Sequence, residues 1–285
     1  MSPDPIITLR GVDKTFVSAQ QQPVEALRGV SLDVRRDAFV ALVGPSGCGK
    51  TTIINLIAGF AQPTSGSVCY KNRPVAGVNR DVGYVPQESK LFPWLSLEQN
   101  ILFPLQVRGY PRQEQQARLR EYLALVGLTG FERALPSQLS GGMQKRASII
   151  RALVYDADVL LMDEPFGPLD AQTKMVLQSD LLRLWGQRPK TVLFVTHDLV
   201  EAIALSDQIV VLTPRPGEVR AVLDVPLARP RDVYRIHEQP GFAAIYERLW
   251  ALFRDELLTD DGTPLDATAA TGSHSAAASI AREPR

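Results

Sequence analysis

The sequence predicts an α/β fold built around a largely parallel sheet. Three apolar segments support this prediction, because each runs like a buried strand and each ends in a chemically distinctive residue. These residues are Gly44, Asp163 and His197. Ligands bind beyond the carboxyl ends of the strands in open α/β sheets, so we expect these three positions to gather at one sheet edge.

The segments around these strands fill in the rest of the chain. Apolar residues alternate or run in strand fashion over 6–44, which predicts short strands joined by turns. Helical spacing predominates over 96–154 and again over 171–185. Another amphipathic helix is predicted at 240–258. From Thr259 onward large apolar residues are too scarce to form a core, so we expect a disordered tail.

Composition excludes several classes of protein. The chain has 285 residues with 31 basic and 31 acidic side chains, so we expect no nucleic-acid partner. Its two cysteines, Cys48 and Cys69, make neither a disulfide framework nor a zinc spacing, which favours a reducing, cytoplasmic setting. The N-terminus lacks the pattern of a signal peptide, and no apolar run approaches the roughly 18 residues that span a bilayer.

A glycine-rich loop follows the first strand. The stretch "GPSGCGKT" matches the pattern G-x-x-x-x-G-K-[ST], whose backbone N–H groups and helix N-terminus hold phosphate groups. Lys50 supplies a charge for the β- and γ-phosphates of a nucleotide such as ATP, and the Thr51 hydroxyl can ligate Mg²⁺. The residues expected to contact the nucleotide are Gly44, Pro45, Ser46, Gly47, Cys48, Gly49, Lys50, Thr51 and Thr52.

Two adjacent carboxylates end the second strand, "VLLMDEP". Beside a phosphate-binding loop, Asp163 fits as a ligand of Mg²⁺, and Glu164 fits as the base that orients and deprotonates a water molecule. His197 ends the third strand, "TVLFVTHD". A single histidine after a strand is usually structural, but at this sheet edge it could hydrogen-bond the γ-phosphate.

A second possible anion site begins at Ser140. Ser140, Gly141 and Gly142 precede a predicted helix, and a hydroxyl and small residues at a helix N-terminus can bind an anion. As a local motif this is a weak signal, and an ordinary serine cap is the default interpretation of the same residues. Because the glycine-rich loop already holds the nucleotide, this site needs a phosphate from elsewhere.

Five motifs occur in order: "GPSGCGKTT", "LSGGMQKR", "VLLMDEP", "FGPLD" and "FVTHD". Together they resemble the ATP-binding cassette (ABC) ATPases over about 6–212. The resemblance implies a P-loop NTPase (RecA-like) core with a mixed sheet, an antiparallel β subdomain and an inserted α-helical subdomain. The implied boundaries are a nucleotide-binding domain at 1–225, its helical subdomain at about 90–152, a helical extension at 226–258 and a tail at 259–285.

The resemblance also implies roles for single residues. Two cassettes of this family face each other head to tail, so Ser140 and Gly142 would contact the γ-phosphate held by a second copy. Gln87 in "YVPQES" matches the glutamine that touches Mg²⁺ and senses the γ-phosphate. Phe16 matches the aromatic that stacks on adenine, although a core phenylalanine remains an alternative. Asp170 matches an aspartate at the dimer interface.

Two positions depart from the family pattern. Met143 stands where many members have glutamine, and Pro168 stands where alanine is usual. Proline fixes φ and lacks an N–H, so hydrolysis could couple differently across the dimer. Neither departure removes a catalytic group.

A chain with one cassette and no spanning segment implies separate transmembrane permease subunits. Leu91, Phe92, Pro93 and Trp94 are candidates for the wall of the groove that accepts them, and packing inside the helical subdomain is an equally open alternative. "LFPW", "LSGGMQ" and "PFGPLDAQTK" resemble the nitrate/sulfonate/taurine branch of importer ATPases. Arg229 and Arg231 are expected on a solvated face rather than as cargo ligands.

The implied function is the ATPase subunit of an importer, bound to the cytoplasmic face of the inner membrane. Its permease would receive a small solute from a solute-binding protein, and the ATPase sequence does not specify that solute. An exporter or lipid-extraction ATPase is one alternative. A soluble ABC ATPase acting on DNA or the ribosome is another, but 96–137 is too short for a long coiled coil and shows no sustained heptads.

Overall fold

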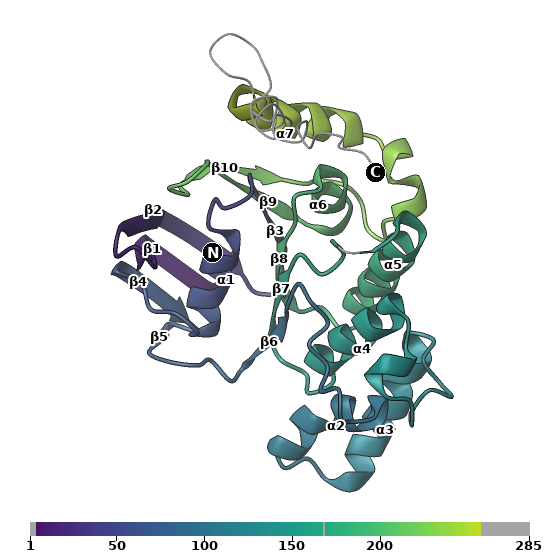
Figure 1. The fold of residues 1–285 in the computed structure, drawn as a ribbon. Coiled ribbons are helices and arrows are strands. Elements are labelled where there is room, and N and C mark those ends of the chain that lie inside the picture. Colours follow the sequence, from purple (N-terminus) through teal and green to yellow (C-terminus); the bar gives the residue numbers. More distant parts are fainter. Residues whose placement is uncertain (1–3, 168, 258–285) are drawn as a thin grey trace, which may run out of the picture.

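Two sheets with helices packed around them form the protein, in the computed structural model that describes residues 4–167 and 169–257 (Figure 1). Pro168 and the predicted tail at 259–285 lie outside the described residues. Within these ranges, no helix combines the length and hydropathy that crossing a bilayer requires. The predicted α/β class, with its mixed sheet, antiparallel sheet and helices, is confirmed.

The larger sheet holds the three predicted strand ends. In spatial order its strands are β10 (Val219–Asp224), β9 (Gln208–Leu212), β3 (Phe39–Val43), β8 (Thr191–Val195), β7 (Val159–Asp163) and β6 (Val82–Val85). Neighbouring strands pair in parallel, except that β10 pairs antiparallel with β9. The carboxyl ends of β3, β8 and β7 therefore share one edge of the sheet.

β3 lies inside this sheet and is buried on both faces. Phe39, Ala41 and Val43 join one hydrophobic core, whereas Val40 and Leu42 join another. Successive side chains of a strand point to opposite faces, so a continuous apolar run fits a strand covered on both sides. The two cores fix the position from which the glycine-rich loop leaves the sheet.

The smaller sheet is antiparallel and covers one side of the molecule. Its strands, in spatial order, are β2 (Pro23–Arg35), β1 (Pro5–Val17), β4 (Ser65–Tyr70) and β5 (Arg73–Pro74). α1 (Lys50–Ala58) packs between the two sheets in Figure 1. Its Ile53 and Ile57 share a core with residues of β1 and β3, which fixes the helix that follows the loop.

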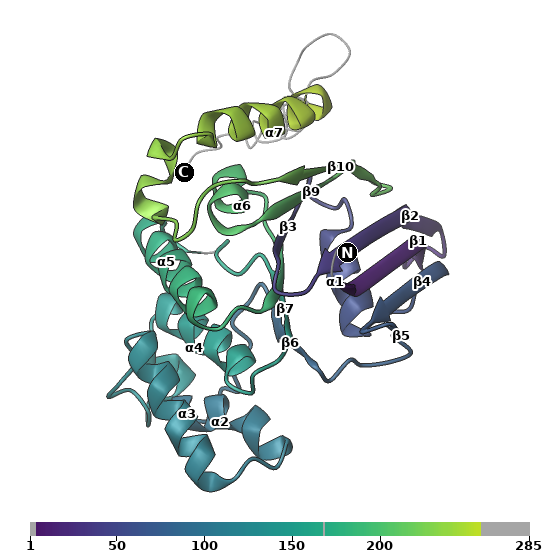
Figure 2. The ribbon, with the colours of Figure 1, turned by 180° about the vertical axis from the view of Figure 1, so that it is seen from behind.

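A group of helices lies away from the smaller sheet, as Figures 1 and 2 show. Its members are α2 (Leu97–Val107), α3 (Arg112–Leu125), a short 3₁₀ helix (Pro136–Gln138) and α4 (Gly141–Leu153). The buried side chain of Asn100 holds the turn that precedes α2. Its amide nitrogen donates to the backbone oxygens of Phe92, Leu95 and Ser96, and its amide oxygen accepts the N–H of Phe92. One satisfied polar side chain thus shapes the 92–96 turn.

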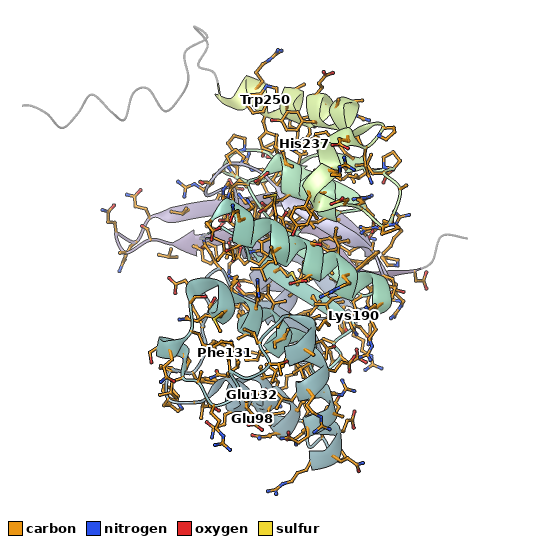
Figure 3. All side chains as sticks on the ribbon, turned by 90° about the vertical axis from the view of Figure 1, so that its right-hand side faces the viewer. Glu98, Phe131, Glu132, Lys190, His237 and Trp250 are labelled. Atoms are coloured by element: carbon orange, nitrogen blue, oxygen red, sulfur yellow. The ribbon has the colours of Figure 1, made fainter. Side chains whose placement is uncertain are left out.

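The remaining helices cover the C-terminal strands. They are α5 (Ala171–Gln187), α6 (Leu199–Leu205), a 3₁₀ segment (Val233–Glu238) and α7 (Phe242–Leu257). Phe242, Leu249 and Phe253 face the core from α7, as helical spacing predicts, whereas Trp250 remains 45% exposed. Figure 3 shows Trp250 and His237 at the opposite end of the molecule from Phe131 and Glu98.

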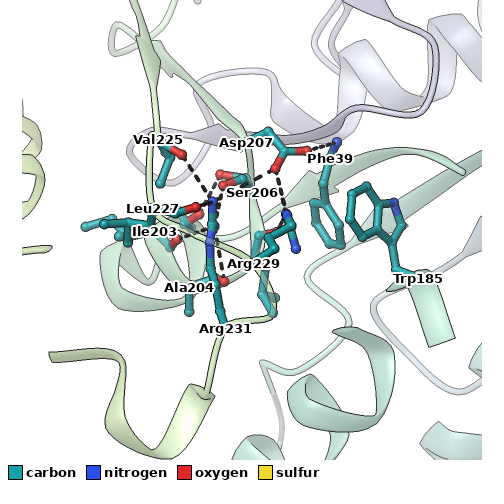
Figure 4. Close-up of polar contacts among 12 residues, drawn as sticks. Phe39, Trp185, Ile203, Ala204, Ser206, Asp207, Val225, Leu227, Arg229 and Arg231 are labelled. Carbon is teal, nitrogen blue, oxygen red and sulfur yellow. Dashed lines mark hydrogen bonds and ion pairs between the residues drawn. The ribbon is translucent and has the colours of Figure 1, made fainter. Parts of the chain in front are cut away.

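The expectation that Arg229 and Arg231 occupy a solvated face is wrong. Only 1% of the Arg231 side chain is exposed, and Figure 4 shows both arginines turned into the protein. Arg231 donates to the backbone oxygens of Ile203, Ala204, Ser206, Val225 and Leu227. Arg229 donates to Leu205 O and to Asp207, and its guanidinium lies 4.2 Å from the centroid of the Trp185 ring.

The physical reason lies at the C-terminal end of α6. The last carbonyl groups of a helix lack partners within the helix, and cations near them are favoured. The two arginines supply these partners, while Asp207 also accepts the N–H of Phe39 at the start of β3. Burial lowers the pKa of Arg231 to about 10, so its guanidinium remains charged at neutral pH. Nothing in the local sequence indicates these distant carbonyl partners.

Candidate functional site

The glycine-rich loop connects β3 to α1 and leaves the helix N-terminus without a side-chain cap. Gly49 occupies the N-cap position with φ of 98° and no capping side chain. A Cβ atom here would lie 2.4 Å from Leu27 Cδ2, so only glycine fits both the backbone angle and the space. The first N–H groups of α1 therefore remain for an anionic ligand, which fits a phosphate group.

Lys50 lies against this loop and is 6% exposed. Its Nζ donates to Gly44 O at 2.7 Å and Pro45 O at 2.9 Å, so the ammonium group is held where phosphates would enter. The Cys48 sulfur is buried 3.8 Å from that Nζ, and burial raises the pKa of the thiol. The Cys48 side chain thus faces the protein, and only its backbone is placed to meet a ligand.

Thr51 and Asp163 join α1 to the end of β7. The Thr51 hydroxyl donates to Asp163 Oδ1 at 3.0 Å, which places two oxygen donors together. Asp163 is 6% exposed; burial raises the pKa of its carboxyl, and the Thr51 hydrogen bond opposes that rise. A hydroxyl and a carboxylate suit Mg²⁺, which usually binds few protein ligands and keeps waters and phosphates.

The Glu164 carboxylate contacts two further side chains that follow the neighbouring strands. Its Oε2 accepts from Gln87 Nε2 at 3.2 Å and lies 3.5 Å from His197 Nδ1. Gln87 follows β6, Glu164 follows β7 and His197 follows β8, so three adjacent strands deliver the cluster. Glu164 also has φ of 40°, in the left-handed region that is uncommon for non-glycine residues.

A second cluster forms around the N-termini of α4 and α5. Ser140 caps α4 by accepting from Met143 N at 3.3 Å, and Asp170 caps α5 by accepting from Thr173 N at 3.0 Å. One surface depression is lined by Ser140, Gly141, Gly142, Met143, Arg146, Leu169, Asp170 and Thr173. None of the residues from Gly44 to Thr52 lines it, so the predicted site residues fall into two separate groups.

The remaining candidates lie outside both clusters. Phe16 lies near the end of β1 with 41% of its surface exposed, and Lys14 Nζ is 4.8 Å from the centroid of its ring. Of the predicted groove residues, Leu91 belongs to the hydrophobic core, whereas Trp94 is 72% exposed. Phe92 is partly buried; its ring is tilted against that of Trp94 and makes an edge-to-face contact with that of Phe103.

Phe92, a predicted groove residue, lines a larger depression whose other lining residues were not predicted. Its apolar wall includes Phe60, Val78, Phe92, Phe103 and Val107. Four cations, Arg80, Lys90, Arg108 and Arg151, stand around that wall. These residues come from segments far apart in the chain, so local patterns indicated few of them. Phe92 lies in the stretch predicted to form the groove, and Phe103 and Val107, four positions apart on α2, carried a partial signal.

Comparisons with known proteins agree with this geometry. The family model described as "ABC transporter" matches residues 27–167. An uncharacterized ABC transporter ATP-binding protein of Methanocaldococcus jannaschii is 43% identical over 82% of this chain and 86% of its own. A taurine import ATP-binding protein of Jannaschia sp. is 36% identical over 87% of this chain and 94% of its own.

Further similarity extends to sulfonate importers and solved structures. An aliphatic sulfonates import ATP-binding protein of Bacillus cereus is 39% identical over 79% of this chain and 88% of its own. A dimeric bacterial ABC transporter cassette aligns with a TM-score of 0.69 and 33% identity, covering 77% of this chain and 98% of that one. The same cassette bound to ADP and Pi aligns with a TM-score of 0.69 and 31% identity.

Proposed function

Since this chain belongs to the ABC transporter family of ATP-binding ATPases, we propose that it is the ATPase subunit of an importer. It works as a head-to-tail pair with a second copy and drives separate transmembrane permease subunits. The import ATPases among its relatives support this proposal, as does the dimeric cassette among similar structures. The depression lined by Phe103 and Val107 is the observation that carries the permease contact.

The glycine-rich loop binds the phosphate chain of ATP in this proposal. Residues 44–52 contribute backbone N–H groups, Lys50 contributes its charge, and exposed Phe16 stacks on the adenine ring. Thr51 and Asp163, whose oxygens lie together, would hold Mg²⁺ with the help of Gln87. When bound, Mg²⁺ would neutralise charge on the β- and γ-phosphates.

Glu164 acts as the general base in this proposal. The Glu164 carboxylate accepts a hydrogen bond from Gln87 and lies near His197. A water molecule that donates to this carboxylate would therefore be oriented towards the γ-phosphate. His197 hydrogen-bonds the γ-phosphate. The strained backbone of Glu164 fixes the direction of its side chain, which is what positioning a nucleophilic water requires.

The second cluster acts on the partner copy. Ser140, Gly141 and Gly142 present a hydroxyl and a helix N-terminus, and Asp170 lies beside them at the proposed interface. Because this group stands apart from residues 44–52, a γ-phosphate can meet both groups only when two chains face each other. ATP binding would then favour the closed pair by contacts that the open pair lacks.

The proposed domain boundaries follow the resemblance. The nucleotide-binding domain spans 1–225, with its helical subdomain at about 90–152. The segment 226–258 is a helical extension, although its Arg229 and Arg231 bond firmly to α6 and its end lies outside the described residues. The extension and the domain therefore share one hydrophobic core.

The solute is of the nitrate, sulfonate, taurine or related class. The taurine and sulfonate importers among the relatives support this class. A solute-binding protein would deliver the solute to the permease, and the ATPase would lie on the cytoplasmic face of the inner membrane. Mutation of this chain can test its contact with the permease.

The depression near α2 offers a sharp test of the permease contact. Phe103 is 41% exposed inside the depression, and Phe131 is 44% exposed outside it, in the turn between α3 and the 3₁₀ helix. Tagged Glu164→Gln protein should co-purify a polytopic permease from solubilised host membranes. Adding Phe103→Asp should abolish this, because a charge would face the apolar wall. Adding Phe131→Asp should leave it unchanged.

Two outcomes would overturn the importer proposal. Recovery of only soluble or ribosomal partners would leave the ATPase chemistry standing and favour a non-transport ABC ATPase. A permease whose transport assay shows outward movement of solute or lipid would favour an exporter or lipid-extraction system. Equal recovery by the Phe103→Asp and Phe131→Asp proteins would place the permease contact elsewhere.

A further inference from the structure

Lys145 is a buried cation that the proposed mechanism does not use. It lies on α4, a little more than one turn after Ser140, and is 1% exposed. Its Nζ donates to the backbone oxygens of Pro86 at 2.8 Å and Gln87 at 2.7 Å. Burial lowers the pKa of Lys145 to about 8, while nearby Asp163 favours its charged form. Such a cation persists in a core only when carbonyl or carboxylate partners surround it.

Gln87 extends this contact to the hydrolysis site. While its backbone oxygen accepts from Lys145, its side-chain Nε2 donates to Glu164 Oε2 at 3.2 Å. A continuous path therefore runs from α4 through the backbone and side chain of Gln87 to the carboxylate of Glu164. Without Lys145, the 86–87 backbone would lose two hydrogen bonds to a charged donor.

Resting on the proposed roles of Gln87 and Glu164, we propose that Lys145 is a positioning residue for ATP hydrolysis. It fixes the backbone of Gln87 so that the Gln87 amide reaches Glu164. Because Ser140 caps the same helix, Lys145 also ties the group that meets the partner's nucleotide to the base in its own chain. A shift of α4 on engaging the partner would thus move Gln87 relative to Glu164.

Lys145→Met tests this proposal, because methionine keeps the length and apolar stem of the side chain but has no donor. We expect kcat for ATP hydrolysis to fall roughly 10- to 100-fold, as when an outer contact of a catalytic group is lost. The KM for ATP should change much less than kcat, since Lys145 does not touch residues 44–52 and reaches the nucleotide site only through Gln87. Steady-state ATPase assays at saturating Mg²⁺ measure both values.

Arg118→Met is the matched control. Arg118 is also a cation that donates to a backbone oxygen, that of Val154 at 2.9 Å, but at the other end of α4. This variant should lose stability without losing kcat. Lys145→Gln keeps an N–H donor, so its kcat should lie between those of Lys145→Met and the unmodified protein. If Lys145→Met does not fold, the kcat of Lys145→Gln relative to the unmodified protein is the test.

Combining Lys145→Met with Gln87→Ala separates positioning from a general structural role. If Lys145 acts through the Gln87 side chain, Lys145→Met should cause little further loss of kcat in a chain that already carries Gln87→Ala. Multiplying losses would overturn the inference, as would an unchanged kcat in Lys145→Met. If Gln87→Ala alone leaves kcat unchanged, the proposed role of Gln87 fails instead.

Discussion

Among single residues, Glu164 is the proposed base because Gln87 and His197 converge on its carboxylate at the ends of neighbouring strands. Glu164→Gln should keep ATP binding but lower kcat by about 100-fold or more, because an amide cannot accept the proton of water. ATP should also hold this variant as a stable dimer. Nucleotide binding, phosphate release and size-exclusion chromatography with ATP measure these properties.

Glu247→Gln is the control for charge, since Glu247 is an exposed carboxylate on α7. It should behave as the unmodified protein in all three measurements. Rapid turnover by Glu164→Gln would assign the base to another residue. Dimer formation by Glu247→Gln in ATP would show that loss of any negative charge is sufficient.

At the scale of elements, α6 depends on residues that arrive much later in the chain. Arg231→Met should lower the free energy of unfolding by about 3 kcal/mol, because it leaves several buried carbonyl groups without a donor. Arg235→Met should change it by less than about 0.5 kcal/mol, since Arg235 is 70% exposed and forms an ion pair with nearby, similarly exposed Glu238. Urea denaturation of both variants compares them.

An equal loss in the two variants would contradict the capping role of Arg231.

The contacts of Arg231 also show which features of the fold the sequence could not predict. Apolar runs predicted β3, β7 and β8, and their carboxyl ends predicted that Gly44, Asp163 and His197 share one edge of the sheet. The partners of Arg231 and Lys145 are backbone carbonyls, which every residue carries, so no residue type in the sequence marks them.

For the whole molecule, the separation of the two site clusters predicts complementation between defective chains. Lys50→Ala removes the phosphate-binding charge, and Ser140→Arg fills the second cluster, so each homodimer should be inactive. A mixed head-to-tail dimer retains one intact site, made of the Lys50 of one chain and the Ser140 of the other. Mixing the two purified variants should therefore restore measurable ATPase activity.

Activity that stays absent after mixing, with mixed dimers demonstrated by two different affinity tags, would contradict the head-to-tail arrangement. Activity in the Ser140→Arg protein by itself would mean that a single chain suffices. A mixture of the unmodified chain with Lys50→Ala serves as the reference for how freely subunits exchange.

The strand order of the larger sheet also has a consequence for synthesis on the ribosome. β3 forms early in the chain, yet its neighbours β8 and β9 begin only at Thr191 and Gln208. Until those residues emerge, the five apolar side chains from Phe39 to Val43 have no strand beside them. A nascent chain would then expose an unpaired, aggregation-prone segment, so translation pauses before Thr191 should increase chaperone binding and misfolding.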